Sequence, residues 1–276
     1  MTRRLSYIAV EGQHDAAFIG RLFRNAGFKI VVNKNDLDPA YSRLVPTDFP
    51  YEDDLLKRVP LPFFYQKLDH AVALHPAGGE SELAARAVIA VPQISRPVEA
   101  IGFVLDADNK GTATERLTTL AGKISEKSQA PGFALPTIPG SISSGPPRCG
   151  VFVMPDNSST GTLEDVLLEC GAVYYGDVLA KAGSYLQSVD QTKFSTEDLG
   201  EINAPAGLKK AQIGATSSVL KPGKAIQNSI ADNRWLEGEA AEQPKVVAFR
   251  LFLRDLLTEP SIYPRSSAQS AVPSSP

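Results

Sequence analysis

Hydrophobic and polar positions along the chain form a repeating pattern that predicts strands followed by helices. Residues 5–10 are a continuous apolar run, which is typical of a buried strand. Just after it, Ile19, Leu22, Phe23 and Ala26 recur at the spacing of one helix face. The first 27 residues therefore predict a strand, a turn and a helix.

The same order repeats along the first two thirds of the chain. Further apolar runs predict strands at 69–75, 101–105 and 149–154, and a helical pattern follows each of them. Strands that alternate with helices are typical of a parallel sheet covered on both faces. We therefore expect an α/β fold with about four parallel strands flanked by helices.

The remaining segments predict the domain organisation. Residues 33–68 contain five prolines and are interpreted as an insertion, with one short helix near 51–58. We expect a core over residues 1–172 and a mostly helical C-terminal region over 173–259. The Ser/Pro-rich residues 260–276 are expected to form a disordered tail.

Composition narrows the class of protein. The net charge is −3, from 28 Lys and Arg against 31 Asp and Glu, which argues against an extended basic coat for nucleic acid. No apolar run approaches the roughly 20 residues of a membrane span, and the N-terminus lacks a signal-peptide pattern. Cys149 and Cys170 fit no metal-binding spacing, so we expect reduced core cysteines in a cytoplasmic protein.

Three acidic residues follow predicted strands. Glu11 ends the first strand, and Asp106 and Asp108 follow the strand at 101–105. Parallel strands place such positions at one edge of the sheet, where ligands bind. If the two strands are neighbours, the carboxylates repel one another unless a proton or a cation lies between them. Hard oxygen donors of this kind indicate Mg²⁺ or Mn²⁺.

The same residues carry a resemblance to a known family. Tyr7–Gly12 with Asp15–Phe18 resembles the first motif of TOPRIM domains, and Phe103–Asp108 resembles their DxD motif. Residues 150–157 and 161–165 resemble TOPRIM-like proteins of the DUF3226 type. These are similar to nucleases of the OLD (overcoming lysogenization defect) family.

The resemblance implies a TOPRIM-like fold and a Mg²⁺-dependent nuclease that hydrolyses phosphodiesters of DNA or RNA. Glu11, Asp106 and Asp108 would be catalytic metal ligands, and Glu164 would help to hold a second ion, with Asp165 beside it. Acidic residues in a first helical turn, such as Glu164 and Asp165, are also favoured by capping alone. The chain has no P-loop motif, so the resemblance implies a separate ATPase partner, as in an anti-phage defence system.

Candidate substrate-binding residues are basic or imidazole side chains. Residues 207–224 carry Lys209, Lys210 and Lys221 and no acidic residue, so one lysine could contact a phosphate. His14 and His75 are placed near strand ends and could contact substrate. Each of these side chains could equally be an ordinary surface or structural residue.

Two other functions stay open. Asp106 and Asp108 after an apolar strand also resemble the start of a haloacid-dehalogenase motif, although Lys110 replaces its usual Thr or Val. A catalytically inactive TOPRIM binding module is the third interpretation. The apolar stretch at Phe249–Leu257 is interpreted mostly as core, with a part that an ATPase or a second copy of the chain could cover.

Overall fold

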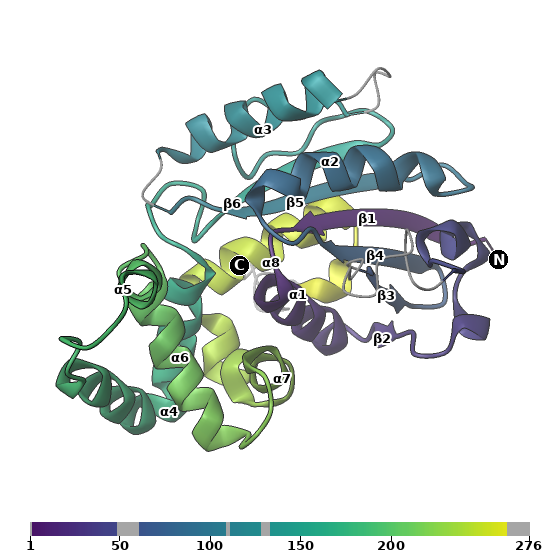
Figure 1. Cartoon of the computed structure of the whole chain (residues 1–276). Helices are drawn as coiled ribbons and strands as arrows, with labels where there is room; N and C mark the ends of the chain where they lie inside the picture. The colour runs from purple at the N-terminus through teal and green to yellow at the C-terminus, as the bar shows by residue number, and fades with distance from the viewer. Residues whose placement is uncertain (1, 49–60, 109–110, 128–132, 264–276) are drawn as a thin grey trace, which may run out of the picture.

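The computed structural model describes residues 2–48, 61–108, 111–127 and 133–263. A six-stranded sheet lies at its centre, in the order β2-β3-β4-β1-β5-β6 (Figure 1). Four strands are parallel: β1 (Arg4–Val10), β4 (His70–Pro76), β5 (Ala100–Asp106) and β6 (Arg148–Met154). Two short strands, β2 (Lys29–Ile30) and β3 (Phe63–Gln66), add antiparallel to one edge.

All four predicted strands are present, but the sheet has six strands instead of about four. The additional β3 lies inside the proline-rich segment that was interpreted as an insertion. Prolines at 60 and 62 precede it, and only four residues pair, so its sequence resembles a loop. The short helix expected near 51–58 lies outside the described residues.

Helices cover both faces of the sheet (Figure 1). On one face lie α2 (Glu80–Ala90) and α3 (Ala113–Lys127), packed on inward side chains such as Tyr7 and Ala9. On the other face lie α1 (Gln13–Asn25) and α8 (Pro244–Leu257), packed on Ile8 and Val10. Alternate residues of β1 therefore point into two separate cores, as the continuous apolar pattern predicts.

The apolar residues of α8 belong to the core. Gly102 of β5 and Gly150 of β6 are paired in register and leave space for this helix. A Cβ at Gly102 would lie 2.8 Å from a Leu256 methyl, and one at Gly150 would lie 2.8 Å from the Phe252 ring. Phe249 and Phe252 are buried there, so the expectation that this stretch offers a docking surface is wrong.

The remaining helices form a group beside the sheet: α4 (Leu163–Ser188), α5 (Thr196–Ile202), α6 (Gly207–Leu220) and α7 (Ile226–Asp232). The expected boundary at 172/173 falls inside α4. This group is joined to the sheet layer because α7 packs against α1 and Trp235 packs against Gly171 of α4.

Short 3₁₀ turns occupy Lys34–Asp36, Pro39–Leu44, Val91–Gln93, Arg234–Leu236, Gly238–Glu242 and Pro260–Ile262. None of the helices in the described ranges is long and apolar enough to cross a membrane.

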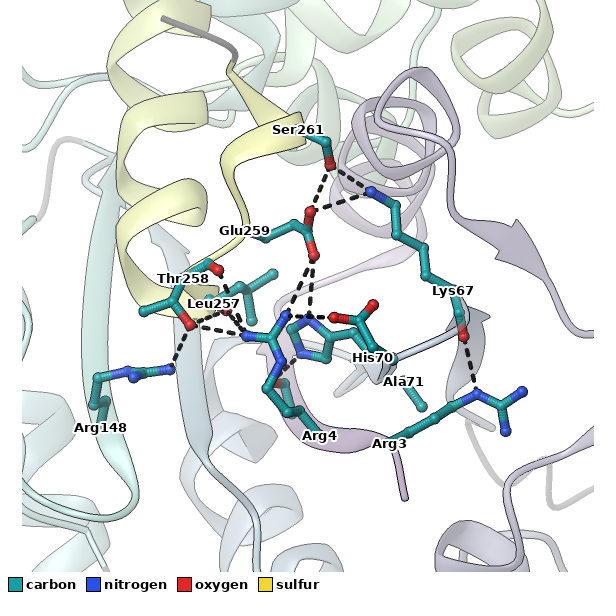
Figure 2. Close-up of polar contacts among 12 residues, drawn as sticks. Arg3, Arg4, Lys67, His70, Ala71, Arg148, Leu257, Thr258, Glu259 and Ser261 are labelled. Carbon is teal, nitrogen blue, oxygen red and sulfur yellow. Dashed lines mark hydrogen bonds and ion pairs between the residues drawn. The ribbon is translucent and has the colours of Figure 1, made fainter. Parts of the chain in front are cut away.

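Polar contacts bind the segment after α8 to the amino-terminal ends of β1 and β4 (Figure 2). Glu259 lies 3.5 Å from Arg4 Nη2, 3.2 Å from Lys67 Nζ and 3.7 Å from His70 Nδ1. Ile262 is buried. The expected disordered tail at 260–276 therefore begins with an ordered turn, and residues 264–276 lie outside the described part.

His70 makes this end of the sheet sensitive to acid. Its Nε2 lies 2.9 Å from the Ser6 hydroxyl, and the side chain is buried. Burial, with a smaller effect of the Arg4 charge, lowers the pKa of His70 to about 4. A histidine in an unfolded chain has a pKa of about 6.5, so between these values only the unfolded chain takes the proton.

We predict that this difference lowers the free energy of unfolding as the pH falls from 7 to 5, by about 2 kcal/mol for His70 alone. In His70→Gln the decline should be shallower, as measured by urea denaturation at each pH. Asp177→Asn on α4 is the control, because Asp177 is exposed, pairs with Lys181 and has no effect on His70. Equal pH dependence in wild type and His70→Gln would contradict the assignment.

Candidate active site

Acidic side chains from four elements meet at the carboxyl edge of the parallel strands. Glu11 follows β1 and Asp106 ends β5, and these strands are neighbours in the sheet. Asp15 lies in the first turn of α1, and Glu164 lies in the first turn of α4. We call Glu11, Asp15, Asp106 and Glu164 the carboxylate cluster.

Backbone amides hold three of these carboxylates in place. Glu11 Oε1 accepts a hydrogen bond from the Asp106 amide at 2.9 Å, which joins β1 to the end of β5. Asp106 Oδ1 accepts from the amide of Leu163 at 2.9 Å, which joins β5 to the start of α4. Asp15 Oδ2 accepts from the Gly12 amide at 2.9 Å. The cluster is thus built into the start of both helices, where partial positive charge favours anions.

Burial and mutual repulsion disfavour the ionised state of three of the acids. Burial, followed by the charge of Glu11, raises the pKa of Asp15. Burial, followed by the charges of Asp15, Glu11 and Glu164, raises the pKa of Asp106 well above its usual range. Burial also raises the pKa of Glu11, to which Asp108 and Glu80 add. The cluster therefore needs protons or added positive charge to be stable.

Glu164 differs from the other three acids. Burial acts to raise its pKa, but hydrogen bonding with His14 and the charge of Lys210 outweigh burial and lower it. His14 Nδ1 lies 3.6 Å from Glu164 Oε1. Glu164 is therefore favoured as a carboxylate, with an imidazole and an ammonium group on the same side.

A buried arginine lies beneath the cluster. Arg116 of α3 donates from Nε to the Asp106 carbonyl at 2.9 Å and from Nη1 to Glu80 at 2.7 Å. Its Nη2 lies 3.6 Å from Glu11 Oε1. With 5% of its surface exposed, Arg116 supplies fixed positive charge that the bulk solvent does not screen.

The cluster borders an open cavity of about 370 Å³, which we call the acidic cavity. His14, the glycines Gly78 and Gly79, and Lys210 of α6 complete its wall. Asp108 lies close enough to act on Glu11 electrostatically. It also lines an adjoining cavity that shares Lys210, and it has the left-handed backbone value φ 53°. Both aspartates of the DxD pattern are therefore at this edge.

Four of the predicted site residues lie elsewhere. Asp165 caps α4 through the Thr162 amide and pairs with Lys209 at 2.7 Å. Lys221 pairs with Asp232 at 2.6 Å. His75 is buried in β4, with Nδ1 2.8 Å from the Tyr7 hydroxyl. None of these four side chains lines the acidic cavity. Their contacts fit the alternative that each is a capping, surface or structural residue.

Sequence reasoning assigned no site role to Asp15 or Arg116. Asp15 was named only as part of the motif that resembles TOPRIM domains, although it follows Glu11 by four residues across a strand–helix turn. That spacing is a signal, because it brings both carboxylates to one strand end. The sequence around Arg116 does not indicate a site residue, because an arginine in the first turns of an amphipathic helix is usually exposed to solvent.

The comparisons with known proteins define the family. The family model DUF3226, described as a protein of unknown function, matches residues 6–258. The chain has the mixed α/β fold described above, and it belongs to the DUF3226 family. It is also similar to the crystal structure of a hypothetical protein from Pyrococcus horikoshii OT3, with a TM-score of 0.49 and 16% identity over 94% of this chain and 98% of that one. No curated protein matches the chain.

The donor chemistry of the cluster fits Mg²⁺ or Mn²⁺. All four groups offer carboxylate oxygens, which these hard cations prefer, and added positive charge would relieve their repulsion. Within the described residues, no three His, Cys, Asp or Glu side chains are arranged as ligands of one ion. Mg²⁺ is usually held by one or two carboxylates together with waters and substrate phosphates. Glu11 and Asp106 could supply such a pair.

We predict that Asp106→Asn raises the free energy of unfolding by about 1–2 kcal/mol at pH 8 without divalent metal. The amide keeps an oxygen for the Leu163 amide but removes a charge from the cluster. Because the folded state binds the protons of these acids more tightly, the cluster destabilises wild type less as the pH falls toward 5, so the difference between variant and wild type should shrink.

The measurement is urea denaturation at pH 8 and pH 5 in EDTA. Asp177→Asn is the control, since Asp177 is exposed on α4 and pairs only with Lys181. A variant that is less stable than wild type at pH 8 would show that repulsion does not dominate this site.

Proposed function

We propose that this protein is a Mg²⁺-dependent phosphodiester hydrolase of the TOPRIM type that acts on nucleic acid. The observation that carries the proposal is the convergence of four carboxylates, three of which have raised pKa values, at the edge shared by β1, β5, α1 and α4. A cation is the ligand that most directly relieves this repulsion, and a phosphate is the substrate that most commonly accompanies it. The resemblance of the Glu11 and DxD motifs to TOPRIM domains points the same way.

Each group would have a distinct role. Glu11 and Asp106 would hold the cation, with Asp108 and Glu164 beside them. When bound, Mg²⁺ would neutralise the phosphate charge and make its phosphorus more electrophilic. Lys210 would bind a phosphate oxygen from the open side of the cavity, and Arg116 would keep Glu11 in place. His14, beside Glu164, would exchange a proton with the reacting oxygens.

A separate ATPase partner and a role in anti-phage defence belong to the same proposal. They rest on the resemblance to OLD-family nucleases and on the lack of a P-loop in this sequence. Because α8 is buried, a partner would have to bind another surface than the one expected from the sequence.

Cleavage assays test the chemistry. We expect the protein to cut single- or double-stranded DNA or RNA with Mg²⁺ or Mn²⁺ and not with EDTA. Glu11→Gln and Asp106→Asn should each lower the rate by at least about 100-fold, while Asp177→Asn should match wild type. Metal-dependent hydrolysis of an aryl phosphate with no cutting of nucleic acid would instead favour the phosphatase interpretation.

The two adjacent lysines provide a matched pair. Lys210 lines the acidic cavity, whereas Lys209 is paired with Asp165. We expect Lys210→Ala to reduce the slope of log affinity against log salt for an oligonucleotide by about one. Lys209→Ala should change this slope less. Equal effects of the two variants, measured by fluorescence anisotropy in EDTA, would contradict the placement of phosphate beside Lys210.

A further inference from the structure

A second cavity lies along α1, next to the acidic cavity. It has a volume of about 260 Å³ and is enclosed by α1, the β2–β3 edge of the sheet and α7. Figure 1 shows α1 between these elements. Gln13, at the start of α1, lines both cavities. We call this second cavity the ring pocket.

The walls of the ring pocket suit a flat apolar group. From α1, the pocket is lined by Ala17, which is partly exposed, and by Ala16 and Gly20, which are buried. From the β2–β3 edge it is lined by Phe63 and Tyr65, and the Tyr65 hydroxyl packs on Gly20. Phe63 is 37% exposed, so a ring could stack on it without moving the core. Gly20 is required here, since any side chain would collide with the Tyr65 hydroxyl.

The rim of the ring pocket carries amide groups. Gln13, Gln227 and Asn228 line it, and none of their side chains makes a hydrogen bond within the part of the chain that the structure describes. An amide both donates and accepts, so three of them can bind the mixed donors and acceptors on the edge of a heterocycle. Arg24 and Asp232, which also line the pocket, pair with each other at 3.6 Å. The rim is thus polar and carries little net charge.

The volume and the position of the ring pocket restrict the class of ligand further. Clefts for larger ligands have volumes of about 300–1,000 Å³, so this pocket fits one ring system. Gln13 and Gly20 are separated by about 10 Å along the helix. Because Gln13 lines both cavities, a nucleotide whose phosphate lies in the acidic cavity can reach the ring pocket with its base.

We propose that the ring pocket receives one base of a single-stranded nucleic acid whose phosphate lies at the carboxylate cluster. The base stacks on Phe63 and packs against Ala17, and its edge binds the rim amides, as in other proteins that read unpaired bases. This inference rests on the proposed function and adds a specificity site to it. A duplex would have to open, or expose a flipped base, to use the pocket.

Binding in EDTA tests the pocket separately from catalysis. A fluorescein-labelled single strand is compared by anisotropy with a strand of equal length and charge that lacks bases. We expect wild type to bind the base-containing strand at least about fivefold more tightly. Ala17→Leu, which fills the pocket, should abolish this preference and leave binding of the base-free strand unchanged.

A second variant keeps the inference testable if Ala17→Leu does not fold. Gln227→Ala with Asn228→Ala removes two rim amides from the surface of α7 and should reduce the preference at least about threefold. Gln187→Ala, an exposed amide on α4, is the control. Equal affinity of wild type for both strands, no binding of either, or a preference unchanged in both pocket variants would overturn the inference. Loss of cleavage with an intact preference would count against the proposed chemistry alone.

Discussion

The parallel pairing of β1 with β5 is the constraint on which the candidate site depends. Val10 and Val104 are opposite one another in this pair, so Glu11, directly after β1, and Asp106, the last residue of β5, share one edge of the sheet. The backbone amide of Asp106 donates to the Glu11 carboxylate at 2.9 Å. The charge of Glu11 disfavours ionisation of Asp106, so this arrangement is costly, and it is held because both strands are buried on two faces.

Positive side chains compensate the acidic charge more on one side of the cluster than on the other. On the side of α3, Arg116 compensates Glu11 and Glu80 with a buried guanidinium. On the open side, the charge of the exposed Lys210 acts on Glu164, whereas the pKa values of Asp15 and Asp106 are raised by burial and by neighbouring carboxylates. Negative charge thus accumulates toward the cavity. Like charges that are held close together at a cost in stability are typical of functional sites.

The C-terminal region is part of this arrangement. α4 contributes Glu164, α6 contributes Lys210, and α8 fills the face of the sheet below the cluster. Gly102 and Gly150 permit that close packing, because any larger side chain on either strand would meet Leu256 or Phe252. Contacts of Glu259 with Arg4, Lys67 and His70 then hold the end of α8 at the opposite edge of the sheet.

The sequence indicated the main elements and three of the four acids of the cluster, Glu11 and Asp106 from the strand pattern and Glu164 from the resemblance. Continuous apolar runs specify buried parallel strands, and the acidic residues after them specify which edge carries the chemistry. Tertiary structure decided the rest, because contacts between distant residues have no local signature. It paired β3 despite its flanking prolines, buried the apolar stretch of α8 and brought Asp15 and Arg116 to the site. It also gave Lys209 an ion-pair partner at 2.7 Å, whereas Lys210, which has none among the described residues, lines the acidic cavity.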